Sequence, residues 1–214
     1  MPQIAKFWNK MAPKYAKQPV PDQTVYEQKL KLTQAKMHPP MQVMEFGCGT
    51  GTTALIHAPF VQHIWATDVA DEMIRIAQEK ASAQHIENVT FERLAFDDMA
   101  LKPASWDMVM GHSILHLMKN KDQVIKDVFQ CLKPGGWFVT STACMGDKLS
   151  FFKWIAPIGQ FLGLLPVLNV FTRQNLRDAM QQAGFVIDHD WQPNNGHTLF
   201  LIAQKPPKSG DNDE

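Results

Sequence analysis

The sequence contains few cysteines and no excess charge of either sign, and these shortages exclude several classes of protein. Its three cysteines, Cys48, Cys131 and Cys144, are scattered over 214 residues. We therefore expect neither a disulfide framework nor a zinc knuckle, and infer a reducing, cytoplasmic compartment. Lysine plus arginine and aspartate plus glutamate each number 21. This balance argues against nucleic acid as a partner held by bulk positive charge.

Long apolar runs are also missing. The first ten residues contain no apolar run of signal-peptide length, and the most apolar stretch, Phe151–Phe171, is interrupted by Lys153 and by prolines. No uninterrupted span reaches the ~18 apolar residues that a transmembrane helix needs. Apolar residues nevertheless make up 45% of the chain, which is enough for a hydrophobic core. We expect one soluble domain over residues 1–204 and a disordered tail at 205–214.

Short apolar runs alternate with helical patterns from Gln42 onward, after a polar segment that is expected to form a loop or short helices. Helices are predicted at 52–58, around 70–77 with Asp71 as the cap, at 122–132 and at 176–183. Strands are predicted at 43–46, 64–68, 89–94, 106–111, 137–142, 185–190 and 198–204. Lys133–Gly136 is expected to end the third helix.

This alternation predicts a mostly parallel sheet with helices on both faces, because strands joined through helices cross over in the same direction. The last two strands are joined by a turn without a helix, so one antiparallel strand is expected at or near the edge. Ligands bind such sheets beyond the carboxyl ends of the strands. The residues that follow each strand are therefore the candidates for chemistry.

A glycine-rich loop follows the first predicted strand. Gly47, Gly49 and Gly51 stand at alternate positions, which permits a sharp turn and a close approach of a ligand to the backbone. Asp68 ends the second strand, about twenty residues after the first glycine, where a carboxylate can hold the two hydroxyls of a ribose. The alternatives are a turn that binds nothing and a helix cap, for which Asp71 is better placed.

The spacing of the loop helps to choose between ligands. Dinucleotide-binding loops follow the pattern G-x-G-x-x-G/A, whereas here Gly51 stands one residue early. A nicotinamide-dependent oxidoreductase is therefore disfavoured. No lysine of the phosphate-binding type follows the loop, which disfavours a nucleoside triphosphate. The pattern favours a ligand that has a ribose and no phosphate.

Taken in order along the chain, several motifs make the sequence resemble the class I S-adenosylmethionine-dependent methyltransferases of the small-molecule type, over about Phe7 to Gln204. The motifs are Val43–Gly51, Asp68, Trp106–Met110, Leu115-His116 and Leu132–Gly136. The resemblance implies a Rossmann-like, doubly wound, mostly parallel seven-stranded sheet with the last strand antiparallel. It also implies transfer of a methyl group from S-adenosylmethionine to a small acceptor, with S-adenosylhomocysteine as the product.

The resemblance further implies roles for individual residues. Gly47 and Gly49, in the loop that Gly51 completes, would pass close to the methionine part of the cofactor, and Asp68 would bind the ribose. The carbonyl of Gly111 would face the ammonium group of the cofactor.

For two further roles, adenine binding and closure over the cofactor, the sequence matches the family pattern less fully. The acid that relatives place near the adenine aligns with Ala95, so either Asp97 or the backbone of Phe96 is expected to hold the adenine amine. Tyr15 resembles an N-terminal tyrosine that closes over the cofactor, and its alternative is packing at a helix end.

Catalysis needs little more than a nucleophile held in line with the carbon–sulfur bond, ~3–3.5 Å away, and the exclusion of water. His112 and His116 are candidate general bases because histidine titrates near neutral pH; the alternative for His116 is hydrogen bonding that shapes its loop. The two are spaced as on one turn of a possible helix, but Ser113 stands where zinc proteins with such a pair carry glutamate. No metal site is predicted.

The apolar segment suggests the acceptor. Residues 145–172 are interpreted as a lid-like insertion and residues 1–41 as an N-terminal cap, which favours an apolar or aromatic acceptor. A dimer interface, core packing and a membrane contact are the alternatives for Phe151–Phe171. The alternative function is a catalytically silent cofactor-binding protein that acts through a partner, suggested by Ala95 alone. The sequence predicts neither the identity of the acceptor nor the oligomeric state.

Overall fold

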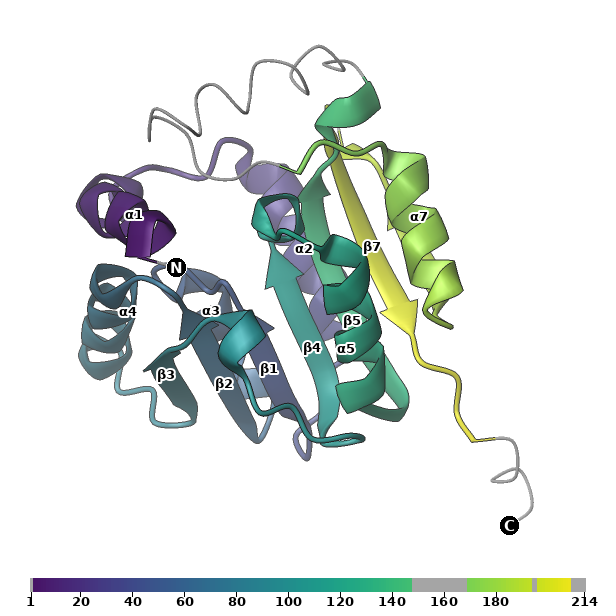
Figure 1. Cartoon of the computed structure of the whole chain (residues 1–214). Coiled ribbons are helices and arrows are strands. Elements are labelled where there is room, and N and C mark those ends of the chain that lie inside the picture. Colours follow the sequence, from purple (N-terminus) through teal and green to yellow (C-terminus); the bar gives the residue numbers. More distant parts are fainter. Residues whose placement is uncertain (1, 148–168, 194–195, 209–214) are drawn as a thin grey trace. The chain divides into compact units, whose positions relative to one another are not determined.

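A computed structural model describes residues 2–147, 169–193 and 196–208 of the chain (Figure 1). Most of the predicted lid and the end of the predicted tail lie outside these residues. The chain divides into two compact units, Met1–Met99 and Ala100–Glu214. The domain boundaries predicted from the sequence stay a prediction.

The first unit contains three parallel strands and their helices. The strands are β1 (Gln42–Phe46), β2 (His63–Asp68) and β3 (Val89–Arg93); the helices are α1 (Pro2–Tyr15), α2 (Gln23–Gln34), α3 (Thr52–His57) and α4 (Asp71–Ala83), with 3-10 turns η1 (Ala58–Phe60) and η2 (Phe96–Asp98). Val43 pairs with Ile64, and Ile64 pairs with Val89. Residues 43–46 are all buried, as expected for a strand covered on both faces.

The second unit contains the remaining four strands. They are β4 (Trp106–His112), β5 (Leu132–Ala143), β6 (Val186–Trp191) and β7 (Thr198–Gln204), with helices α5 (Lys121–Cys131) and α7 (Arg173–Gln182) and 3-10 turns η3 (Leu115–Leu117) and η4 (Met145–Asp147). β4 and β5 are parallel, and β7 is antiparallel to both β5 and β6. Figure 1 shows α5 and α7 over the same face of this part of the sheet.

The strand order is β3-β2-β1-β4-β5-β7-β6. This confirms the predicted fold class: the strands are mostly parallel, and the last one in the chain runs antiparallel next to the edge strand β6. Leu199–Ala203 of β7 are all buried, so this strand reads as a continuous apolar run. None of the described helices is long and apolar enough to cross a membrane.

One boundary differs from the sequence prediction. Lys133–Gly136 does end a helix, but it does not form a loop, because β5 already begins at Leu132. The residue before a proline is restricted to extended conformations, and Lys133 precedes Pro134. Gly135 and Gly136 then pair through their backbones with Lys205, at 2.8 and 2.9 Å. The strand is therefore completed by a partner 70 residues away in the sequence, which no local pattern indicates.

Candidate functional site

The glycine loop joins β1 to α3 through an unusual backbone. Gly47, Gly49 and Gly51 have φ values of 66°, 55° and 72°, a left-handed region that costs other residues about 1–2 kcal/mol each. The N–H of Cys48 donates to the carbonyl of Thr67 at 2.9 Å, which holds the start of the loop against β2. The predicted sharp turn is therefore present.

The glycines serve different purposes. A Cβ on Gly51 would lie 2.7 Å from the Cβ of Ala77 and from the ring of Phe91, so this position lacks a side chain because α4 and β3 pack against it. A Cβ on Gly49 would meet only the ring of Tyr15, at 3.8 Å. At Gly49 the loop backbone is therefore open to a ligand.

Asp68 connects this loop to the start of α4. Its Oδ2 accepts a hydrogen bond from the N–H of Gly49 at 2.9 Å, and its Oδ1 accepts one from the N–H of Ala70 at 3.0 Å. Burial raises the pKa of Asp68 above its ordinary value, while these backbone donors oppose the rise. A carboxylate oxygen accepts more than one hydrogen bond, so both oxygens can still accept from hydroxyl groups of a ligand.

The prediction that Asp71 caps α4 is wrong. Ala70 occupies the N-cap position, with the extended φ of −101° and ψ of 119° that this position requires, and Asp71 is already the first helical residue. Asp68 instead accepts from the Ala70 amide. The sequence offered ligand binding and helix capping as alternatives for Asp68. One carboxylate can do both, so the contact with Ala70 does not argue against ligand binding.

Glu45 was missed as a candidate site residue. It is only 2% exposed, and its Oε2 has no hydrogen-bond partner among the residues that the structure describes. Burial, together with the nearby Asp68 carboxylate, raises the pKa of Glu45 to about 8. A buried carboxyl oxygen without a partner is costly, which favours a cationic ligand beside it. The signal in the sequence was a carboxylate inside an otherwise apolar strand.

Tyr15, the last residue of α1, lies beside the same loop. Burial raises the pKa of its phenol, and the carboxylates of Asp68 and Glu45 raise it further. Its ring meets Trp8 edge to face, with centroids 6.4 Å apart, although the residue as a whole is 46% exposed. The structure thus brings Tyr15, Gly49 and the two carboxylates together. Closure over a cofactor stays a prediction.

The segment predicted to hold adenine follows β3. The ring of Phe96 is buried and packs against Phe46, with centroids 4.7 Å apart. Asp97 is exposed. The N–H of Leu94 donates to the backbone carbonyl of Asp68 at 3.0 Å. This bond holds the segment next to Asp68, the residue predicted to bind the ribose. The choice between Asp97 and the Phe96 backbone stays a prediction.

In the second unit, the carbonyl of Gly111 accepts a hydrogen bond from the Thr140 hydroxyl at 2.8 Å. His112 ends β4 and His116 lies in η3, so the prediction of one helical pair is wrong. Ser113 between them has a φ of 54°, and its N–H donates to the Ser141 carbonyl at 2.7 Å. The strand pairing therefore continues past His112, where the sequence suggested a helix.

The environment of His116 makes it a weak base. Burial lowers the pKa of His116 to about 4, so the ring is neutral at neutral pH. Its Nδ1 is buried without a hydrogen-bond partner in the described part of the chain. Among the same residues no group of three or more histidines, cysteines and acids could hold a metal ion. A catalytic role for either histidine stays a prediction.

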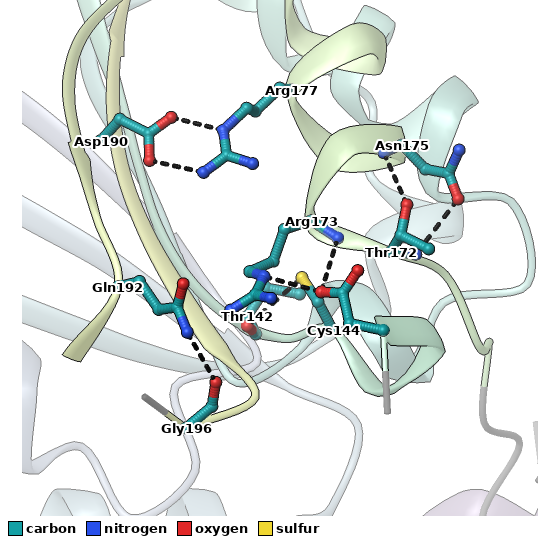
Figure 2. A network of polar contacts seen from close by, with 10 residues as sticks. Thr142, Cys144, Thr172, Arg173, Asn175, Arg177, Asp190, Gln192 and Gly196 are labelled. Atoms are coloured by element: carbon teal, nitrogen blue, oxygen red, sulfur yellow. Dashed lines mark hydrogen bonds and ion pairs between the residues drawn. The ribbon is translucent and has the colours of Figure 1, made fainter. Parts of the chain in front are cut away.

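A polar network follows the carboxyl end of β5 and was not foreseen (Figure 2). Asp147 accepts from Arg173 Nε at 2.7 Å, and Thr172 and Asn175 form a reciprocal capping box at the start of α7. The N–H of Gly146 donates to the carbonyl of Phe171 at 2.9 Å. The two ends of the predicted insertion, 145–147 and 169–172, are therefore tied together.

Comparison with known proteins shows the family. A family model described as a methyltransferase domain matches residues 37–204, so the chain belongs to the methyltransferase-domain family. This confirms the resemblance to class I S-adenosylmethionine-dependent methyltransferases.

Two curated relatives illustrate the sequence similarity. The chain is 29% identical over 126 residues to a ubiquinone biosynthesis O-methyltransferase of Albidiferax ferrireducens, covering 58% of this chain and 50% of that protein. It is 26% identical over 110 residues to the uncharacterized methyltransferase YcgJ of Bacillus subtilis, covering 51% of this chain and 44% of that protein. The match thus spans about half the length of these relatives.

Solved structures show the same fold. The YcgJ crystal structure aligns with a TM-score of 0.69 and 14% identity, over 85% of this chain and 99% of that one. The [4+2]-cyclase SpnF aligns with a TM-score of 0.75 and 15% identity, over 95% of each chain. The second protein is named for a different reaction, so the fold alone does not define the chemistry.

Proposed function

We propose that this protein transfers a methyl group from S-adenosylmethionine to a small organic acceptor by in-line displacement. The observation that carries the proposal is the cluster at the ends of β1 and β2. There Asp68 accepts from the amide of Gly49, and Glu45 lies buried beside it. Membership of the methyltransferase-domain family gives this cluster its chemical context.

The residues of this cluster fit the cofactor. Asp68 has acceptor capacity left for two ribose hydroxyls. Glu45 and Asp68 together make the loop a site for a cation, and S-adenosylmethionine carries a sulfonium and an ammonium group. When bound, the cofactor supplies a methyl group that is already electrophilic. Tyr15 would cover it, and Gly49 would allow its close approach.

The other assignments are part of the same proposal. Gly47 would line the loop, Phe96 or Asp97 would hold the adenine amine, and Gly111 would offer its carbonyl. Gly51 is assigned to packing on the geometry described above. If the acceptor is a hydroxyl, His112 is the better candidate base, because His116 holds a proton weakly.

The acceptor is proposed to be small and apolar or aromatic. One relative is named as a ubiquinone biosynthesis O-methyltransferase, which supports a small-molecule acceptor. The apolar character rests on the amino-acid sequence of residues 151–171, of which only 169–171 lie within the described residues.

The test is transfer of an isotopically labelled methyl group from S-adenosylmethionine into a metabolite extract, followed by mass spectrometry. The wild-type protein should label a small apolar product, and Asp68→Asn should label much less. Asp71→Asn is the matched control, because Asp71 is exposed and pairs only with Arg93 in the described structure. Binding of S-adenosylhomocysteine without any labelled product would favour the catalytically silent alternative.

A further inference from the structure

Helix α1 is joined to α4 by a polar contact as well as by apolar packing. Ala12 of α1 is buried with Ala70 and Met73, and Trp8 and Ile76 pack against them. In addition, Oδ1 of Asn9 accepts a hydrogen bond from the N–H of Glu72 at 2.9 Å, across 63 residues of sequence. Figure 1 shows α1 next to one end of α4 in this unit.

The contact supplies a cap that α4 lacks. The first N–H groups of a helix have no partner within it and need external acceptors. Ala70, at the N-cap, has no side chain that can accept. Asp68 accepts from the N–H of Ala70, and Asn9 accepts from the N–H of Glu72. The first turn of α4 is therefore capped by two side chains: Asp68, the candidate ribose-binding residue, and Asn9 of α1.

This arrangement ties the N-terminal helix to the cofactor loop. Tyr15 lies six positions after Asn9 on the same helix, and its ring lies next to Gly49. The hydrophobic effect has no direction, so apolar packing defines the orientation of a helix less sharply than a hydrogen bond does. The hydrogen bond that Asn9 accepts from the Glu72 amide sets the rotation of α1 about its axis and its position along α4. It thereby sets the position of Tyr15 relative to Gly49.

We propose that Asn9 is a positioning residue for cofactor binding: its bond to the Glu72 amide holds α1 where Tyr15 covers the glycine loop. The inference rests on the proposed function for its ligand, but the contact itself is independent of any ligand. A purely helical role for Asn9 is disfavoured, because asparagine is a poorer helix former than alanine.

The experiment compares Asn9→Ala, Asn9→Asp and Lys10→Ala in the full chain. Asn9→Ala removes the acceptor while raising the helix propensity of α1. Asn9→Asp restores an acceptor, which is also favoured at the positive end of α4. Lys10→Ala is the matched control at the exposed neighbouring position. The readouts are calorimetric binding of S-adenosylhomocysteine and amide hydrogen exchange of residues 4–16 and 72 in the ligand-free protein.

Asn9→Ala should raise the dissociation constant about threefold to tenfold, the equivalent of one lost hydrogen bond, and should speed exchange in α1 and at Glu72. Asn9→Asp should bind within about twofold of wild type, and Lys10→Ala should match wild type in both readouts. A lower unfolding temperature with unchanged affinity and unchanged exchange in α1 would reduce Asn9 to a cap and overturn the proposal.

The two proposals fail in different ways. If the wild-type protein does not bind S-adenosylhomocysteine, the proposed function fails, and the exchange data still decide whether Asn9 holds α1 in place. If the wild type binds and Asn9→Ala binds equally well, the positioning role fails while the proposed function stands.

Discussion

Replacing Glu45 by glutamine should change how the stability of the protein depends on pH. Burial and the Asp68 carboxylate raise the pKa of Glu45 to about 8, whereas an unfolded glutamate titrates near 4.3. Between these values the folded protein keeps a proton that the unfolded chain releases. The unfolded state then binds fewer protons, so the free energy of unfolding falls as the pH rises.

The size of the effect follows from the same linkage. One such carboxyl lowers the free energy of unfolding by at most about 1.4 kcal/mol per pH unit, or about 2–3 kcal/mol between pH 5 and pH 7. Glutamine resembles the protonated side chain and does not titrate. Other titrating groups, including His57 and His116, are common to both proteins. The difference between the two proteins therefore isolates Glu45.

The assay is urea unfolding followed by tryptophan fluorescence at pH 5, 6, 7 and 8, for wild type, Glu45→Gln and the exposed control Glu87→Gln. The advantage of Glu45→Gln over wild type should grow with pH, and Glu87→Gln should run parallel to wild type. A cation bound beside Glu45 would drive its ionisation. Calorimetry in buffers of different ionisation enthalpy should therefore show proton release with S-adenosylmethionine in wild type and in Glu87→Gln, and none in Glu45→Gln. Parallel stability curves for wild type and Glu45→Gln would refute the reasoning.

Four further substitutions test other parts of the structure. Gly51→Ala should cost about 2–4 kcal/mol in urea unfolding, because its Cβ would overlap the ring of Phe91 in a strained backbone. Gly135→Ala should cost only about 1–2 kcal/mol, because its Cβ would meet nothing within 4 Å and only the left-handed strain remains. His57 is buried and its pKa is lowered to about 4, so its own contribution to the free energy of unfolding should fall as the pH drops from 6.5 toward 4, opposite in sign to the contribution of Glu45. The stability of His57→Leu relative to wild type should therefore rise over this range, and equal slopes for the two proteins would contradict the burial argument. Arg177→Ala should change stability by less than about 1 kcal/mol, less still in high salt, because its ion pair is partly exposed.

Local patterns predicted the strands and the sharp turn of the glycine loop well. The alternation of apolar runs and helices indicated all seven strands, and the turn-linked final pair indicated the antiparallel β7. Gly47, Gly49 and Asp68 were predicted as site residues because close backbone approach and ribose binding need particular residue types at a particular spacing. These features depend on neighbours in the sequence, so the sequence reveals them.

Features that depend on distant partners were not predicted. Asp71 looked like a helix cap, but the backbone reaches its N-cap geometry one residue earlier, at Ala70. Asn9 caps the same helix from 63 residues away. The burial of Glu45 depends on the tertiary packing around β1. The apolar residues on either side of it in the sequence did not by themselves indicate a role for its carboxyl group. In each case the deciding contact is made only after folding.

Calorimetric titration with S-adenosylhomocysteine tests the central claim most directly, using wild type, Asp68→Asn and the exposed control Asp71→Asn. Wild type and the control should bind alike, and Asp68→Asn should bind about 1–3 kcal/mol more weakly through the loss of charge-assisted hydrogen bonds. Equal affinity in all three proteins would contradict the assignment of the glycine loop and Asp68 to the cofactor.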